Sequence, residues 1–291
     1  MIYSTTTHSI KSKDGLKGVI KTVADAGFPA VDISFCQEYD FVLADGYKES
    51  AREIREYAQS LGIRINQTHA PFSSYEIYTE KLVPNMSRFV EFSGLLGASQ
   101  IIIHPIQRSS NHFKYAEELF RENMEFYSSL ASTAKKFGVK VAIENMFNSR
   151  PVSKFIEDSA CASAEEFIRY FDTLNDREAF TVCLDIGHVA LCGREPEDLI
   201  YALGDRIGAL HVQDVDYVND LHTLPGFGKI DWDKVCRALA EIDYKGDFTL
   251  ESTSVPARCD EEFTPIAVRF MNDVAAYYSE KIEKYKMQLK K

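Results

Sequence analysis

Six metal-capable side chains recur along the chain, each at the end of a short apolar run. They are separated by 35, 40, 41, 26 and 40 residues: His69, His104, Glu144, Asp185, His211 and Glu251. Several carboxylates buried at one place repel each other unless a cation compensates them. A mixed carboxylate and imidazole set suits Mn, Co, Zn or Fe better than Mg or Ca. We therefore predict one divalent metal ion, Mn, Co or Zn, with four core ligands: Glu144, Asp185, His211 and Glu251.

The alternation of side chains supports a common direction for these ligands. In the fifth apolar run, Glu144 shares its face with Ala142. The opposite face carries Val141 and Ile143. The runs before the other three core ligands show the same division between small or polar and bulky apolar residues. Because successive side chains of a strand point to opposite faces, all four ligands are expected to point to one interior.

A long acidic loop, residues 213–230, follows His211. Loops longer than about 12 residues in a compact domain are usually functional or disordered. Here an apolar run precedes the loop and an amphipathic segment follows it, which favours function, and Gly226 and Gly228 turn the chain back. Its polar residues are Asp214, Asp216, Asp220 and His222. We expect its aspartates, with Asn145 and Gln213, to orient the metal ligands by hydrogen bonds.

Eight units of strand followed by helix carry these residues. The predicted strands are 1–5, 30–35, 63–68, 100–103, 139–143, 180–184, 207–212 and 247–250. The predicted helices are 15–26, 47–61, 78–96, 114–137, 163–174, 196–204, 231–242 and 260–285. Alternating strands and helices imply a parallel sheet. Eight units predict one closed (β/α)8 TIM barrel over residues 1–291, with the last helix and a fraying basic tail in about 260–291.

An open doubly wound sheet is the alternative fold. It would require a glycine-rich phosphate turn after an early strand, and the sequence has none there. The loops that follow the strands are long, at 70–77, 105–113, 145–162 and 213–230, whereas the opposite turns are short. Active sites of TIM barrels are built from the loops after the strands, so that face is expected to carry the function.

Composition limits the classes of partner. The chain has 291 residues, 45% hydrophobic and 26% charged, with a net charge of −11. Nucleic acids and anionic membranes are bound mainly through Lys and Arg, so neither is expected. The 6 cysteines form no CxxC pair and indicate reduced thiols. We see neither a signal peptide nor a membrane span. We expect a cytoplasmic protein with a small-molecule partner and leave a homo-oligomer open.

Other candidates have a simpler interpretation. His8 and His112 are assigned no role, and Cys183 is interpreted as packing. Arg108, Arg150 and Lys229 lie on the functional face and could bind an anion, but loop cations are usually only solvated. Three aromatic residues could line a sugar face, although core packing is equally expected of each: Phe72, Phe147 and Trp232.

The motifs, taken in order, resemble the xylose isomerase-like TIM barrel superfamily over nearly the whole chain. They are THAPF (68–72), IIIHP (101–105), AIEN (142–145), LDIGH (184–188), ALHVQD (209–214), DLHTLPGFGKIDW (220–232) and TLES (249–252). The resemblance implies a metal-dependent sugar or sugar-phosphate isomerase or epimerase. It implies that Glu144 and Glu251 act as acid and base through an enediolate, and that His188 contacts substrate. Ketose 3-epimerases of this family often carry an arginine where this chain has Tyr217, which disfavours that activity.

The same superfamily includes the zinc-dependent endonuclease four, which cleaves abasic DNA. Its nine ligands to three zinc ions all have a match here, and five of them lie outside the core set: His69, His104, His188, Asp220 and His222. These five are therefore predicted to bind either substrate or additional metal. The acidic net charge favours the isomerase. A metal-dependent dehydratase or keto-acid isomerase of the same fold is a further alternative.

Overall fold

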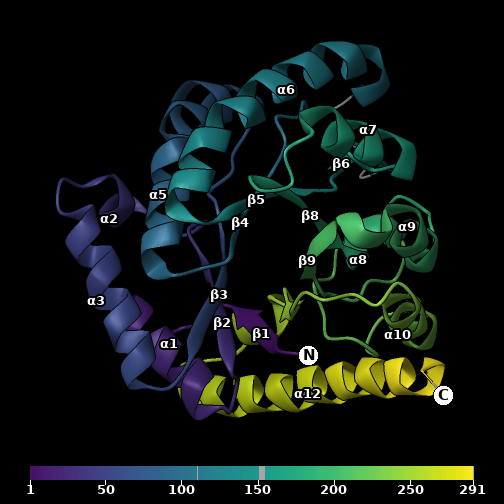
Figure 1. Ribbon diagram of the computed structural model, residues 1–291. Coiled ribbons are helices and arrows are strands. Elements are labelled where there is room, and N and C mark those ends of the chain that lie inside the picture. Colours follow the sequence, from purple (N-terminus) through teal and green to yellow (C-terminus); the bar gives the residue numbers. More distant parts are fainter. Residues whose placement is uncertain (110, 151–154, 291) are drawn as a thin grey trace.

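The computed structural model describes residues 1–109, 111–150 and 155–290. Eight parallel strands surround a central axis (Figure 1) in the order β10-β1-β2-β3-β4-β5-β8-β9. They are β1 (Tyr3–Thr6), β2 (Ala30–Ser34), β3 (Arg64–His69), β4 (Gln100–Ile103), β5 (Lys140–Glu144), β8 (Phe180–Asp185), β9 (Ile207–His211) and β10 (Phe248–Leu250). A parallel bridge between Val212 and Leu250 joins β9 to β10. The predicted (β/α)8 barrel is confirmed.

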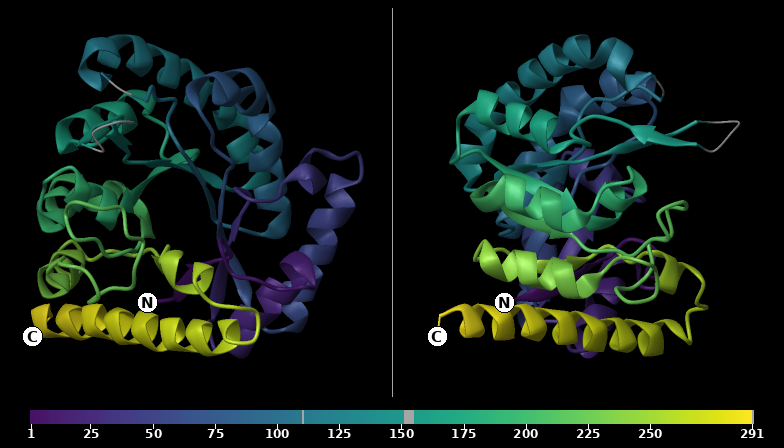
Figure 2. Two further views of the ribbon diagram at one scale, coloured as in Figure 1. Left: turned by 180° about the vertical axis from the view of Figure 1, so that it is seen from behind. Right: turned by 90° about the vertical axis from the view of Figure 1, so that its right-hand side faces the viewer.

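Helices cover the outside of the barrel (Figure 2). The longer ones are α1 (Gly15–Asp25), α3 (Tyr47–Ser60), α5 (Met86–Leu96), α6 (His112–Phe137), α7 (Ala164–Leu174), α9 (Pro196–Leu203), α10 (Trp232–Glu241) and α12 (Thr264–Leu289). Short segments are α2 (Asp40–Leu43), α4 (Tyr75–Ile77), α8 (Ile186–Leu191), α11 (Ser254–Ala257), a π-helix (Tyr78–Leu82) and 3-10 turns (Val83–Asn85, Gly204–Arg206). None of the described helices is long and apolar enough to cross a membrane.

Most side chains that point into the barrel are small or polar, as the alternation predicts. Ile102, Ala142, Cys183 and Ala209 form a separate buried cluster inside it. A register shift in the pairing of β2 with β3 lies at Asn66. At this bulge two successive amides reach interior partners: Asn66 Nδ2 donates to Ser4 Oγ at 3.0 Å, and Gln67 Oε1 accepts from Thr249 Oγ1 at 3.2 Å. A bulge re-aims a strand, so β3 contributes an extra polar side chain below the rim.

Two of the predicted helices differ from the structure. The helix predicted from residue 78 is regular only over α5, because a π turn and a 3-10 turn occupy residues 78–85. The last helix begins at Thr264 rather than at residue 260 and continues to Leu289 instead of fraying. Lys286 explains this end, since its buried ammonium donates to Tyr244 O at 2.5 Å and to Glu283 Oε1 at 3.0 Å. One lysine of this basic segment is therefore buried and hydrogen-bonded instead of solvated.

The loop 145–162 contains an unpredicted antiparallel hairpin, β6 (Phe147–Ser149) and β7 (Ile156–Asp158). Its strands have only three residues each, too few for an alternation of side chains to be recognised in sequence. The right-hand view of Figure 2 shows the hairpin projecting beyond the barrel. It stands over the same face as the long loops that follow the other strands.

Candidate metal centre

The four predicted core ligands converge at one rim of the barrel. One ligand atom each from Glu144, Asp185, His211 and Glu251 lies within 4.8 Å of all the others. His211 Nδ1 lies 2.7 Å from Glu144 Oε1 and 3.6 Å from Glu251 Oε2. Glu144, Asp185 and His211 are fully buried, whereas the side chain of Glu251 is 15% exposed. One edge of the cluster therefore faces the loops, where a substrate can approach.

Strand register explains why these residues meet. Asp185 is directly opposite His211 between β8 and β9, and Glu144 is opposite Cys183 between β5 and β8. In neighbouring parallel strands, paired residues point to the same face. Glu251 reaches the same rim because its N–H donates to Val212 O at 2.9 Å, one residue after His211. Residues 26 to 41 positions apart in sequence thus become neighbours through pairing alone.

Hydrogen bonds from outside the cluster fix Asp185. Its Oδ1 accepts from the backbone N–H of His188 at 2.7 Å and so caps α8. Its own N–H donates to Asn145 Oδ1 at 2.8 Å, and Gln213 Nε2 donates to Asp185 Oδ2 at 3.2 Å. Asn145 and Gln213 therefore have the orienting contacts expected of residues around a metal ligand.

The donor set fits a divalent cation. Glu144 Oε2 and Glu251 Oε2 are buried and accept no hydrogen bond of good geometry from the described residues, although His104 Nε2 lies 3.1 Å from the first. Buried carboxylates without compensation are costly, and these two share a site with a third, Asp185. Three carboxylates and one imidazole around one point match the ligands preferred by Mn, Co or Zn. These atoms could hold one such ion.

His69 and His104 lie on the other side of Glu144. His104 Nε2 is 3.1 Å and His69 Nε2 is 3.6 Å from Glu144 Oε2. His69, Glu144 and His211 also form a group whose ligand atoms lie within 4.8 Å of one another. Phe72, which is 52% exposed, stacks on the His104 ring with the centroids 4.4 Å apart. Phe72 thus covers this histidine at the rim instead of packing in the core.

A second cluster lies beside the first and consists of His188, Asp220 and His222. His188 Nδ1 is 2.9 Å from Asn145 O, and His222 Nδ1 is 3.0 Å from Glu251 O. A carbonyl oxygen only accepts, so both Nδ1 atoms carry hydrogen. Nε2 of His222 then faces Asp220 Oδ1 at 3.2 Å, where a proton or a cation must lie between them. The five additional residues predicted from sequence are therefore all placed around the core set.

The backbone of the second cluster is strained. His222 has a φ of +43°, a left-handed conformation that residues with a β-carbon adopt rarely. Such conformations persist only where surrounding contacts enforce them. Here Ser254 Oγ donates to His222 O at 2.9 Å, and the N–H of Ser254 donates to the same oxygen at 3.2 Å. The first residue of α11 therefore holds His222 in this conformation.

The charges within the centre are strongly coupled. Burial alone would raise the pKa of Glu144, but His211 and His104 outweigh it and hold this pKa well below its usual range. Burial raises the pKa of Asp185 to about 7, although His188 opposes the shift. Burial would lower the pKa of His211, but the thiol of Cys183 and the carboxylate of Glu144 raise it well above its ordinary value. Protons on imidazoles thus balance the carboxylates, a role that a bound cation would take over.

Asp214 organises the long loop rather than a metal ligand. Its two oxygens accept from the N–H groups of Val215 (2.9 Å), Gly226 (2.8 Å) and Ile230 (3.1 Å), and from Trp232 Nε1 (2.9 Å). Asp216 likewise caps its own loop, accepting from the N–H of Asn219 at 2.6 Å. Of the loop aspartates expected to orient the ligands, only Asp220 lies in the centre.

The remaining candidates have structural partners. His112 Nε2 lies 2.9 Å from Glu166 Oε1 and joins α6 to α7. Arg108 pairs with Glu118 at 2.8 Å, and Arg150 pairs with Glu157 at 2.9 Å. These contacts place neither arginine in the centre. The hydroxyl of Tyr217 donates to Glu195 at 3.4 Å, so the position where related epimerases often carry a cation has none here.

The other two aromatic candidates, Phe147 and Trp232, lie in different environments. The ring of Phe147, at the start of the hairpin, lies 4.9 Å from the ring of His188 and borders the second cluster. Trp232 is buried and donates to Asp214. The first therefore lines the site, and the second belongs to the core beneath the loop.

Sequence reasoning missed Cys36, which follows β2 at the same rim. Its Sγ lies 3.3 Å from His69 Nδ1 and 3.6 Å from Ala70 O. Burial would raise the pKa of this thiol, but His69 outweighs it and lowers the pKa to about 7. Its position in the sequence was the available signal. Cys36 comes directly after the predicted strand 30–35, just as His69 comes directly after the predicted strand 63–68.

We predict that limited iodoacetamide treatment alkylates Cys36 before any other cysteine. The reactive species is the thiolate, and burial raises the pKa of Cys183, Cys192 and Cys236 to about 12. Peptide mass spectrometry over time measures the order of modification. Cys192, the other half-buried cysteine, is the internal control, and its faster modification would refute the expected activation by His69.

Comparisons with known proteins agree with this architecture. An uncharacterized protein of Sinorhizobium fredii is 22% identical over 277 residues, covering 84% of each chain. The D-psicose 3-epimerase of Enterocloster bolteae is 24% identical over 248 residues, 81% of this chain and 76% of that protein. A solved structure described as a D-tagatose 3-epimerase-like protein superposes with a TM-score of 0.75 at 20% identity, covering 98% of this chain and 99% of that one. The sequence profile of one family matches residues 20–274, and the chain belongs to that family, the xylose isomerase-like TIM barrels.

Proposed function

We propose that the protein is a metal-dependent isomerase or epimerase of a sugar or sugar phosphate. The observation that carries this proposal is the placement of two glutamates around one imidazole, with Glu144 and Glu251 at 2.7 Å and 3.6 Å from His211 Nδ1. Proton transfer next to a carbonyl needs a base that takes the proton and an acid that returns it. The likeness to a D-psicose 3-epimerase supports the same class.

Glu144, Asp185, His211 and Glu251 would hold the ion, with Asn145 and Gln213 orienting Asp185. When bound, a divalent ion polarises a carbonyl oxygen and stabilises the negative charge that develops on it. Glu144 would act as a carboxylate, because His211 and His104 outweigh burial and lower its pKa. One glutamate removes the carbon-bound proton, and the same or the opposite glutamate returns it. Return to the neighbouring carbon isomerises the sugar, and return to the other face epimerises it.

The histidines of the second cluster and the hairpin would bind substrate. Asp220 and His222 are 32% and 23% exposed, and His188 lies beside Phe147. Imidazole nitrogens and a carboxylate can hydrogen-bond sugar hydroxyls, while an aromatic ring covers an apolar sugar face. The hydroxyl of Tyr217 donates to Glu195, so this position offers no cation to a phosphate group, and an uncharged sugar suits it better.

The test is a panel of ketoses, sugar phosphates, keto-acids and inosose-like cyclitols, each incubated with the metal-loaded protein in deuterated water. Deuterium that enters a carbon-bound position shows that a proton has left carbon and been replaced from solvent. NMR of the product distinguishes exchange at the original carbon from exchange at its neighbour. Absence of incorporation across the panel, with metal bound, would contradict the proposed chemistry.

Metal binding is expected to release protons and to strengthen as pH rises. The pKa of His211 lies well above its ordinary value, so its imidazole keeps its proton to a higher pH than a free imidazole does, whereas a metal needs the neutral ring. Asp185, with a pKa of about 7, must also lose its proton. Metal affinity should therefore fall as pH drops, first as His211 gains its proton and further as pH passes below the pKa of Asp185 at about 7. Titration calorimetry with Mn²⁺ in buffers of different ionisation enthalpy counts the protons, and a pH-independent affinity would contradict this prediction.

A phosphodiesterase with several zinc ions is the second candidate, favoured by the convergence of His188, Asp220 and His222 beside the core set. The net charge of −11 opposes it, because binding to DNA phosphates depends on Lys and Arg. Elemental analysis of the purified protein, together with an abasic oligonucleotide, decides between the two. One metal per chain without cleavage supports the isomerase, and three zinc ions with cleavage would establish the nuclease.

A further inference from the structure

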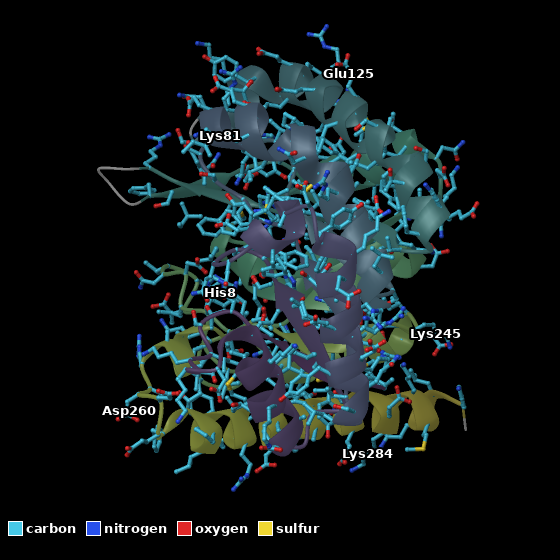
Figure 3. The ribbon with its side chains drawn as sticks, turned by 90° about the vertical axis from the view of Figure 1, so that its left-hand side faces the viewer. His8, Lys81, Glu125, Lys245, Asp260 and Lys284 are labelled. Atoms are coloured by element: carbon cyan, nitrogen blue, oxygen red, sulfur yellow. The ribbon has the colours of Figure 1, made fainter. Side chains whose placement is uncertain are left out.

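We propose that two copies of this chain associate through the outward face of α12 and the adjoining tip of the loop 213–230. We call this surface the α12 patch and define it by five exposed apolar side chains: Phe227, Phe263, Ile266, Phe270 and Tyr277. Figure 3 labels Asp260, which lies just before α12, and Lys284, which lies in its C-terminal part, along one edge of the molecule. The proposed occupant is the same patch of a second copy.

The α12 patch is a continuous stripe. Residues 263, 266, 270 and 277 follow the three- and four-residue spacing, with one turn skipped, that puts side chains on one side of a helix. They are 52%, 58%, 47% and 58% exposed, while the opposite side of the helix buries Val268, Met271 and Ala275. Phe227, 62% exposed, extends the stripe from the loop, and its ring lies 5.9 Å from that of Phe270. A helix with apolar residues on both sides is expected to have a second partner.

The patch combines exposed rings with two hollows. Phe270 lines both hollows, and Phe227 lines the first of them. One hollow, of about 370 Å³, reaches towards Val274 and Tyr278. The other, of about 470 Å³, reaches towards Val255 and Ala267. A twofold interface requires one surface to fit itself. This surface offers both a ridge and hollows, so the ridge of each copy can enter a hollow of the other.

Charges on the patch complement each other in an antiparallel pair. Arg269 and Asp273 are exposed on this side of α12, and neither forms an ion pair with any described residue. A twofold axis near Met271 would place Arg269 of each copy opposite Asp273 of the other. Opposed charges at a rim fix the register and orientation of the partners. The arrangement pairs both charges without burying either one alone.

The exposed area is consistent with a dimer. Five large side chains, each 47–62% exposed, correspond to about 500 Å² of apolar surface per chain, taking about 200 Å² for each. That value lies near the upper end for the largest apolar patch of a typical monomer. A standard interface buries about 800 Å² on each partner, so the polar rim with Arg258, Arg269 and Asp273 must supply the remainder.

The same contact would brace the candidate site. Phe227 lies five residues after His222 on one loop, and Gly226 between them has a φ of +86° that fixes the turn. A partner packed on Phe227 would restrict the movement of the loop that presents Asp220 and His222. Dimerisation and ordering of the second cluster are thus expected to be coupled.

The test is sedimentation equilibrium of the full chain at micromolar concentration. The wild type is expected at twice the 33.0 kDa of one chain. Phe270→Glu should raise the dimer dissociation constant at least about 30-fold, the effect of removing an interface hot spot. Phe113→Glu is the matched control, because Phe113 is 77% exposed but lies on α6, and it should leave the dimer intact. Circular dichroism checks that each variant is folded.

Charge reversal tests the antiparallel register. Arg269→Asp and Asp273→Arg each place like charges together and should weaken the dimer, whereas the double reversal should restore it. A double variant as weak as the single ones would overturn the proposed register. A monomeric wild type at these concentrations, or a dimer equally stable in the Phe270→Glu and Phe113→Glu variants, would overturn the interface.

Discussion

Glu144→Gln and Glu251→Gln are each expected to reduce turnover at least about 10³-fold, within the range attributed to general acid and base groups. Glutamine keeps the size and the hydrogen-bonding shape of the side chain but cannot accept a proton at neutral pH. In Glu144→Gln the loss also removes the negative charge that His104 and His211 face at 3.1 Å and 2.7 Å. Deuterium incorporation reports on the removal of the carbon-bound proton, and product formation reports on the complete reaction.

The two variants should differ in metal binding. Glu144 is fully buried and lies within 3.9 Å of four imidazoles, whereas Glu251 lies at the exposed edge. Glu144→Gln should therefore weaken metal binding more than Glu251→Gln does. Glu118→Gln is the control, because Glu118 lies near the same rim but is 54% exposed and pairs with Arg108. Unchanged activity in either site variant, with the fold intact, would remove the mechanism based on two glutamates.

The barrel, and the meeting of the four predicted core ligands at one rim, could be predicted because both depend on repetition. One predicted core ligand lies at the end of each of β5, β8, β9 and β10, and strand pairing converts the sequence spacing into contact, as Asp185 opposite His211 shows. Alternation along β5, β8 and β9 predicted the inward cluster of Ala142, Cys183 and Ala209. Such signals are local and periodic, so they survive without any knowledge of tertiary structure.

The rest depends on contacts between segments that have no common pattern. Nothing near Asp214 in the sequence shows that its oxygens accept from Gly226, Ile230 and Trp232. The same is true of Lys286, whose buried partner Tyr244 lies on another segment. Cys36 resembles a packing residue until β2 and β3 place it beside His69. The role of such a polar side chain depends on its partners, and only the fold shows which residues these are.

Asp214→Asn is expected to destabilise the protein by roughly 3 kcal/mol, because hydrogen bonds to a charged acceptor contribute more than neutral ones and buried groups would lose their partners. Asp214 is fully buried and accepts four hydrogen bonds, two at each oxygen. The amide group of asparagine would point an N–H at two of these donors. Gly228 packs closely against this carboxylate, since a β-carbon there would meet Asp214 Oδ1. The thermal midpoint should fall by roughly 6–10 °C.

Trp232 makes this change directly observable, because it is the only tryptophan of the chain and donates to Asp214 Oδ2 at 2.9 Å. Loss of that acceptor should alter the fluorescence emission of Trp232 before the protein unfolds globally. It should also change the affinity for the proposed substrate, because His222 lies on the same loop. Asp216→Asn is the matched control, since Asp216 lies two residues away but bonds only within the exposed turn at Val218 and Asn219. Equal shifts of the midpoint in both variants would show that the loop does not depend on Asp214. A shift confined to Asp214→Asn would show that one buried carboxylate holds the loop that carries the second cluster.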